Sequence, residues 1–148
     1  AIKVAGLENV LVRLSRCCRP LPGDEIIGFV TKGRGITVHR KDCPNIVSLE
    51  PGSSKLSQVA WDVEKESVFQ VEIEVEAFDR VGVLKDILSE VAEVKTNVSE
   101  AHVRTKSGST AYITLVVDVR DVKHLSDVMK VIRKVSDVYD VYRADINK

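Results

Sequence analysis

Hydrophobic and polar positions alternate most regularly in residues 69–77. Apolar side chains occupy every second position from Phe69 to Ala77, and glutamine or glutamate fills the positions between them. Because successive side chains of a strand point to opposite faces of a sheet, this pattern predicts a strand with one buried and one solvated face. In residues 84–94 the apolar positions recur at helical intervals instead, which predicts an amphipathic helix.

The rest of the second half continues this series of elements. Strands are predicted at 97–105 and 110–119 with a hairpin turn at 106–109, then a helix capped by Asp121 and a last strand at 138–146. The order β-α-β-β-α-β is that of a ferredoxin-like unit, in which both helices cover one face of the sheet. We therefore predict an α+β protein whose residues 68–148 form such a domain.

Residues 1–64 are predicted to form a separate, small, β-rich domain. Its expected elements are strands at 10–14, 26–31, 36–39 and 59–63, turns at 20–24 and 32–35, and a short helix with Pro44 in its first turn. A unit of about sixty residues lies at the lower limit of what a hydrophobic core alone can stabilise. A metal ion or a neighbouring domain would therefore help this unit to fold.

All three cysteines of the chain lie in this first half, together with one histidine. Cys17, Cys18, His39 and Cys43 make up a Cys₃His set, which suits a tetrahedral zinc ion. Adjacent side chains of a strand point to opposite faces, so Cys17 and Cys18 reach one ion only from a turn. The alternative is that the cysteines are small buried apolar groups.

A catalytic role finds little support in the sequence. A cysteine and a histidine can form a nucleophilic pair, but no third group that would orient them can be placed. The other two histidines, His102 and His124, are isolated and expected on solvent-exposed faces. We expect no catalytic residue in this chain.

Composition and charge restrict the class of protein further. No run of about 18 apolar residues predicts a membrane span, and two adjacent cysteines among three do not form a secreted disulfide framework. We therefore expect a cytoplasmic protein, and the lack of an initiating Met suggests a fragment of a longer chain. The net charge is zero, yet residues 1–49 hold eight Lys/Arg against four acids, a net of +4.

The basic half is the part expected to meet nucleic acid, although solvation of the surface would explain the charge equally well. Aromatic platforms for single-stranded bases are almost absent, since we expect both Phe29 and Trp61 in the core. Recognition of the shape and phosphates of a folded RNA fits better. The candidate phosphate-binding residues are Arg16, Arg19, Lys32, Arg34, Arg40 and Lys41.

The segment Asp79–Gly82 lies where a predicted strand passes into a predicted helix. Gly82 would let the backbone approach a ligand, and the free amides of a helix N-terminus attract a carboxylate. Asn97, at the start of the next strand, offers further hydrogen bonds. The alternative is a turn that needs a glycine and a capping Asp79.

Two resemblances bring these features together. Residues 68–146, with Asp-Arg-Val-Gly-Val-Leu at 79–84, resemble an ACT domain, a regulatory module that commonly binds amino acids, often across a dimer interface. Arg-Leu-Ser-Arg-Cys-Cys-Arg-Pro-Leu-Pro-Gly-Asp at 13–24 and Gly-Arg-Gly-Ile-Thr-Val-His-Arg-Lys-Asp-Cys-Pro-Asn at 33–45 resemble the conserved-cysteine module of the RelA/SpoT family. That module is also called the zinc-finger or ribosome-intersubunit domain.

The resemblance implies the regulatory C-terminus of an enzyme that makes and hydrolyses (p)ppGpp in the stringent response, without its synthetase and hydrolase domains. It implies contact with ribosomal RNA on a ribosome that holds uncharged tRNA, control of the parent chain's catalytic domains, and a homodimer through the ACT domain. The implied signature positions of the cysteine module are Cys17, Cys18, His39, Asp42 and Cys43.

For the ACT domain the resemblance implies an amino-acid ligand, with valine, isoleucine or leucine expected. The implied ligand-binding residues are Asp79, Arg80, Val81, Gly82, Val83, Leu84 and Asn97. A structural alternative remains, in which the chain is a zinc-stapled oligomerisation and docking module that binds no small molecule.

Overall fold

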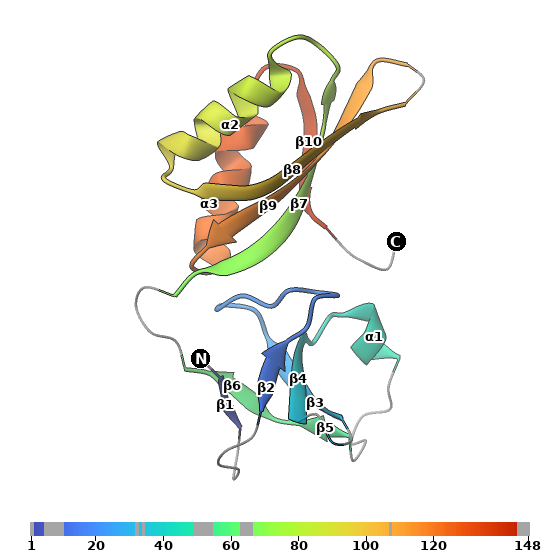
Figure 1. Ribbon diagram of the computed structural model, residues 1–148, viewed down its shortest axis with the longest axis vertical. Coiled ribbons are helices and arrows are strands. Elements are labelled where there is room, and N and C mark those ends of the chain that lie inside the picture. The colour runs from blue at the N-terminus through green and yellow to red at the C-terminus, as the bar shows by residue number, and fades with distance from the viewer. Residues whose placement is uncertain are drawn as a thin grey trace. The chain divides into compact units, whose positions relative to one another are not determined.

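The structure, a computed structural model, describes residues 2–4, 11–31, 33, 35–48, 55–62, 67–106 and 108–144 (Figure 1). The chain divides into two compact units, an N-terminal unit, Ala1–Ser67, and a C-terminal unit, Val68–Ala144. Both contain strands and helix, so the predicted α+β class is confirmed. Within the described ranges, no helix combines the length and the apolar character that crossing a membrane requires.

The N-terminal unit is built on a four-stranded sheet in the order β2-β4-β3-β5. Strand β2 is parallel to β4, and the other neighbours are antiparallel. Strands β1 and β6 pair separately, and one short helix, α1, follows β4. The bounds are β1 Ile2–Val4, β2 Val12–Leu14, β3 Ile26–Thr31, β4 Gly35–Arg40, α1 Pro44–Val47, β5 Leu56–Ser57 and β6 Val59–Trp61.

Side chains of β4 alternate between two small cores, one on each face of this sheet. Ile36 and Val38 are buried on one face, where Trp61 packs against their cluster. Thr37 and His39 point to the other face, which carries the cysteines. Gly35 permits the close pairing of β2 and β4, since it has φ +85° and a β-carbon there would lie 2.1 Å from the carbonyl oxygen of Leu11.

The C-terminal unit has a fully antiparallel sheet in the order β10-β7-β9-β8, with both helices on one face (Figure 1). This is the predicted ferredoxin-like topology. The bounds are β7 Phe69–Phe78, α2 Val83–Glu93, β8 Asn97–Thr105, β9 Thr110–Val119, α3 Val122–Arg133 and β10 Val138–Arg143. The last two residues of the predicted final strand, 145 and 146, lie outside the described ranges.

The hydrophobic periods of the sequence explain how this unit packs. Ile73 and Val75 of β7 and Ile113 of β9 are fully buried beneath the helices. Ile87 of α2 and Ile132 of α3 contribute the facing side chains, also fully buried. Burial of each such side chain stabilises the fold by about 1.5–3 kcal/mol before the entropy cost of ordering the chain.

The prediction that His124 is solvent-exposed is wrong, whereas His102 is exposed as predicted. The His124 ring is buried near the start of α3, where the backbone N–H of Arg120 donates to Nδ1 at 3.0 Å. The proton of the neutral ring is therefore on Nε2, which donates to Thr96 Oγ1 at 2.8 Å. Asp121 caps α3 as predicted, accepting from the His124 N–H at 2.7 Å.

Candidate functional site

The two adjacent cysteines lie in a turn and not in a strand. The turn covers residues 16–18, directly after β2, and the Arg19 N–H closes it with a 3.1 Å hydrogen bond to the carbonyl oxygen of Ser15. Arg19 takes a left-handed conformation with φ 43°, which is uncommon for a residue with a side chain. The condition under which Cys17 and Cys18 can face one ion is therefore met.

The turn, strand β4 and the N-terminus of α1 bring Cys17, Cys18, His39 and Cys43 together as a cysteine cluster. One ligand atom from each residue lies within 4.8 Å of all the others. Cys17 Sγ is 3.3 Å from His39 Nδ1 and 3.5 Å from Cys43 Sγ, and Cys18 Sγ is 3.8 Å from His39 Nδ1. Bonds of about 2.3 Å to sulfur and about 2.1 Å to nitrogen set tetrahedral ligand separations of about 3.6–3.8 Å. The cluster could therefore hold a metal ion.

The members of the cluster differ in the direction of their pKa shifts. Burial raises the pKa of Cys43 and raises that of Cys18 to about 12. Burial raises the pKa of Cys17 too, but hydrogen bonds with Ser15 and other neighbours outweigh it and lower the pKa overall. Burial lowers the pKa of His39, so the ring is neutral at pH 7, the form that binds metals. The pKa is thus lowered at Cys17 and raised at Cys18 and Cys43.

The backbone supplies a hydrogen bond that sequence reasoning missed. The N–H of Arg40 donates to Cys18 Sγ at 3.3 Å, and such outer hydrogen bonds orient thiolate ligands of a metal. No residue type marks a backbone donor of this kind. Only the end of β4 at Arg40, immediately after His39, could have suggested it.

The six candidate phosphate-binding residues differ in their exposure and in their pairing with acidic groups. Arg16 and Lys41 are exposed, and Arg19 is half-buried. Arg40 donates from Nη2 to Asp42 Oδ2 at 2.6 Å, so part of its charge is already balanced within the protein. Lys32 and Arg34 lie outside the described residues.

The residues predicted around the amino-acid ligand fall into two groups. The β7–α2 loop, Asp79–Gly82, places a fully exposed Val81 side chain beside Gly82, which has φ +85° and precedes α2. Val83 is buried and Leu84 is half-buried at the start of the helix. These six consecutive residues share one end of the sheet.

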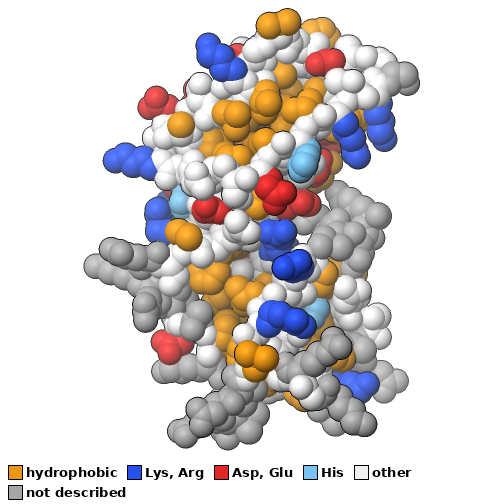
Figure 2. Space-filling model, viewed as in Figure 1, with side chains coloured by type: hydrophobic (Ala, Val, Ile, Leu, Met, Phe, Trp, Pro, Cys, Tyr) orange, Lys and Arg blue, Asp and Glu red, His pale blue; other side chains and the backbone are white. Residues whose placement is uncertain are grey.

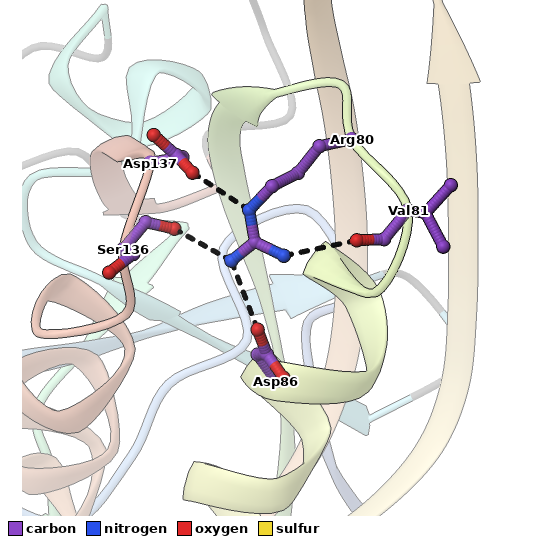
Figure 3. A network of polar contacts seen from close by, with 5 residues as sticks. All are labelled: Arg80, Val81, Asp86, Ser136 and Asp137. Carbon is purple, nitrogen blue, oxygen red and sulfur yellow. Dashed lines mark hydrogen bonds and ion pairs between the residues drawn. The ribbon is translucent and has the colours of Figure 1, made fainter.

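Arg80 holds this loop in place (Figure 3). Its Nε donates to Asp137 Oδ2 at 2.7 Å, and its Nη2 donates to Asp86 Oδ2 at 3.0 Å. Nη2 also donates to the carbonyl oxygen of Ser136 at 3.2 Å, and Nη1 donates to that of Val81 at 3.1 Å. The hydrogen bonds to Asp137 and Asp86 raise the pKa of Arg80. Because its contacts join the loop to α2 and to the turn before β10, Arg80 is a positioning residue of the loop.

Asn97 is not brought to this loop. It pairs with Asp118 of β9, which pairs with Gln70 near the start of β7, whereas Phe78 at the end of β7 adjoins the loop. Gln70 and Phe78 are eight residues apart, about 26 Å along an extended strand. Asn97 and the loop therefore lie at opposite ends of one sheet, and the Asn97 amide donates to Asp118 Oδ2 at 2.8 Å.

Family models and known proteins match both units. The model of the RelA/SpoT RIS domain matches residues 2–62, and an ACT domain model matches residues 65–143. A GTP pyrophosphokinase of Streptomyces coelicolor is 44% identical over 143 residues, which is 97% of this chain and 17% of that protein. The bifunctional (p)ppGpp synthase/hydrolase RelA of Mycobacterium tuberculosis is 42% identical over 143 residues, 97% of this chain and 19% of that protein.

Among solved structures, the ACT domain from a GTP pyrophosphokinase of Chlorobium tepidum aligns with a TM-score of 0.47 and 23% identity, covering 53% of this chain and 100% of that chain. The chain spans less than a fifth of the length of the two relatives named above. The residues that match the RIS domain model precede those that match the ACT domain model. The chain belongs to the RelA/SpoT family, of which it contains the RIS domain and the ACT domain.

Proposed function

We propose that this chain is a regulatory C-terminal region of a RelA/SpoT protein and controls catalytic domains elsewhere in its parent. The N-terminal unit docks on ribosomal RNA of a ribosome that holds tRNA, and the C-terminal unit senses an amino acid. The chain has no catalytic activity of its own in this proposal. The parent protein is a cytoplasmic GTP pyrophosphokinase and (p)ppGpp hydrolase of the stringent response.

The observation that carries the sensing function is the β7–α2 loop held open by Arg80. Within the described residues, the backbone N–H groups of Val81, Gly82 and Leu84 donate to no protein acceptor. They surround the N-terminus of an eleven-residue helix, where amides and the helix dipole favour a carboxylate. The exposed Val81 side chain offers an apolar contact for valine, isoleucine or leucine.

A second copy of the chain would complete this site. Strand β8 pairs only with β9 in the part of the chain that the structure describes, which leaves its other edge available. If two β8 edges pair antiparallel, the start of one β8 meets the end of the other, near the β7–α2 loop. Asn97 of each copy then approaches Asp79–Gly82 of the other. We therefore propose a homodimer with two shared ligand sites.

Hydrophobic side chains lie where such a dimer would form. Ala101 and Val103 point to the helix side of β8, opposite the buried Leu115 and Ile113, yet both remain exposed. Figure 2 shows hydrophobic side chains gathered on the C-terminal unit where α2 and β8 lie. An uncovered edge strand with apolar side chains is a natural pairing surface.

For the N-terminal unit we propose zinc as the metal, since the Cys₃His set and its separations suit this ion. Zinc would fix the turn that carries Arg16 and the end of β4 that precedes Lys41. Both side chains are exposed and lie beside the cluster in sequence. They remain candidates for rRNA phosphates, with Arg19, Lys32, Arg34 and Arg40 completing the proposed surface.

Calorimetric titration with valine, isoleucine and leucine tests the sensing proposal. We expect saturable binding of one amino acid that is lost in Gly82→Val, because a valine at φ +85° is strained and narrows the approach to the amides. Gly108→Val is the matched control: Gly108 has φ +111° in another turn of the same unit, and a β-carbon there would meet no group within 4 Å apart from its chain neighbours. Its valine variant should bind normally.

The structural alternative predicts a different result. It is favoured by Arg80, whose hydrogen bonds would serve equally well to brace a turn that binds nothing. Absence of binding across the three amino acids, with both valine variants folded, would leave an oligomerisation and docking module. Docking is tested separately with Arg16→Glu and Lys41→Glu, which should weaken co-sedimentation with ribosomes.

A further inference from the structure

A cavity of about 550 Å³ adjoins the cysteine cluster in the N-terminal unit. Its described lining residues are Arg13, Leu14, Ser15, Arg16, Cys17 and Thr37. Two of the six are arginines and none is acidic. We propose that this cavity is a binding site for a phosphate group, with Arg13, Arg16 and Thr37 as its ligands.

The parallel pairing of β2 with β4 places Arg13 beside Thr37. The two residues are partners in the register, so their side chains share one face of the sheet. Arg13 Nη2 donates to Thr37 Oγ1 at 3.5 Å, a long hydrogen bond to a neutral group. The hydroxyl of Thr37 keeps its own proton and can donate it to an anion, while the guanidinium retains most of its donors.

Arg16 brings a second positive charge from the turn that follows β2. It is exposed, and in the described parts of the chain no carboxylate pairs with it. Arg40 and Arg80, in contrast, are each paired with aspartate at 3.0 Å or less. Two arginines and no acid are therefore among the described residues that line the cavity, and arginine suits recognition of a phosphate group.

The position of the cavity is fixed by the same structure that forms the cysteine cluster. Thr37 and His39 lie two residues apart on one face of β4, and Cys17 belongs to both the cluster and the cavity wall. The visible face of the molecule in Figure 2 carries Lys and Arg side chains on this side of the N-terminal unit, where β2 faces the viewer. The site is thus open to a large ligand and not only to a free ion.

Two sources of the phosphate group fit this chemistry, the backbone of a folded RNA and a free nucleotide. Binding of an RNA phosphate rests on the docking function proposed above. Arg13 and Thr37 would then be RNA-binding residues that the sequence did not indicate. The nucleotide source is independent of that function. A cavity of this volume is large enough for either a phosphodiester or a nucleotide.

Fluorescence anisotropy of a labelled RNA hairpin and calorimetry with ADP and inorganic pyrophosphate test the proposal on the full 148-residue chain. Arg13→Gln and the near-isosteric Thr37→Val are compared with Arg120→Gln, an exposed arginine of the other unit. We expect hairpin affinity to fall about tenfold or more in Arg13→Gln, as for loss of a charged hydrogen bond. In Arg13→Gln the slope of log affinity against log salt concentration should decrease in magnitude by about one. Arg120→Gln should bind the hairpin as the unchanged chain does.

The outcomes separate the cavity from the docking function. Saturable binding of ADP or pyrophosphate that Arg13→Gln and Thr37→Val both weaken, without hairpin binding, supports a phosphate site and contradicts RNA docking. Hairpin binding that neither variant changes overturns the cavity proposal and leaves docking on other residues. No binding of any probe overturns both. Circular dichroism confirms that each variant is folded before its affinity is compared.

Discussion

Arg80 Nε donates to Asp137 Oδ2 at 2.7 Å, and this ion pair joins the β7–α2 loop to the turn before β10. Asp137 has φ +74°, a conformation that few residues other than glycine adopt. Its carbonyl oxygen also accepts the N–H of Phe78 at 2.8 Å, at the end of β7. One arginine therefore sets both the shape of the loop and the geometry of a strained turn.

Arg80→Lys is expected to loosen both segments while keeping the charge. A lysine ammonium cannot match the planar fork that reaches Asp86, Asp137 and two carbonyls together. We expect faster hydrogen exchange at Phe78 and Val83, whose N–H groups donate to the carbonyl oxygens of Asp137 and Arg80, and weaker binding of the amino acid that the unchanged chain binds. Combination with Asp137→Asn should be non-additive, since both changes disrupt one network.

Arg104→Lys is the control for this experiment. Arg104 lies over the ring of Tyr112, 5.4 Å from its centroid, away from the network. Its replacement should leave exchange in the β7–α2 loop unchanged. Exchange at Phe78 and Val83 that is equally slow in Arg80→Lys and in the unchanged chain would show that Arg80 does not hold the loop.

The fold was largely predictable because alternation and helical spacing directly encode which face of each element is buried. Strands at 97–105 and 110–119 match the prediction residue for residue. His124 was misplaced because its partner Thr96 is 28 residues away and leaves no periodic signal. Arg80 and Asp137, 57 residues apart, escaped prediction for the same reason.

The site was predicted as a set of residues but not as an arrangement. The turn that unites Cys17 and Cys18 depends on a left-handed Arg19, which no local residue type announces. The separation of Asn97 from Gly82 could have been derived from the topology. In a β-α-β-β order the first two strands start at the same end of the sheet. Asn97 starts the second of these strands, whereas Gly82 follows the end of the first, so the two residues lie at opposite ends. Topology, and not spacing along the chain, decides which residues meet.

Removal of the metal is expected to destabilise the N-terminal unit selectively. Zinc at a thousandfold excess over its dissociation constant would add about 4 kcal/mol to the free energy of unfolding. The fluorescence of Trp61, the single tryptophan, reports this unit, and the three tyrosines all lie in the other unit. A chelator should therefore lower the melting temperature seen by Trp61 and leave the tyrosine signal unchanged.

Cys43→Ser provides the control for zinc. It should lose the one zinc per chain that elemental analysis is expected to find, and chelator should then have no further effect. A chain that takes up no zinc, with a Trp61 transition that chelator does not move, would identify Cys17, Cys18 and Cys43 as buried apolar groups.

His124 makes the stability of the C-terminal unit depend on pH. Burial, assisted by the charge of Arg120, lowers the pKa of His124 below 6.5, although Asp121 and Asp127 oppose this. The unfolded chain therefore takes up a proton at a higher pH than the folded chain does. The stabilisation is complete above pH 6.5 and is lost as the pH falls through 6.5 toward the folded pKa.

Denaturant unfolding followed by tyrosine signals between about pH 7.5 and 5 measures this effect. His124→Leu should flatten the pH dependence of the free energy of unfolding. It should also lower that free energy by about 1–3 kcal/mol at pH 7, because the Arg120 N–H loses its buried acceptor. His102→Gln, which replaces an exposed histidine of the same unit, should retain the full slope. An equal slope in the His124 variant would assign the pH dependence to other groups.

Val103→Glu is expected to disrupt the proposed dimer. Val103 is 47% exposed on the helix side of the edge strand β8, and a symmetric interface would contain the new charge twice. We expect the dimer dissociation constant, measured by sedimentation, to rise about a hundredfold or more, since two buried like charges each cost more than about 1.4 kcal/mol. His102→Glu, on the other face of the same strand, should have a much smaller effect on the dimer dissociation constant.

Val103→Glu also tests whether the ligand site is shared between two copies. Because Asn97 of a second copy completes the proposed site, amino-acid binding should weaken together with dimerisation in Val103→Glu. Binding that persists in a monomeric Val103→Glu would mean that one copy is sufficient.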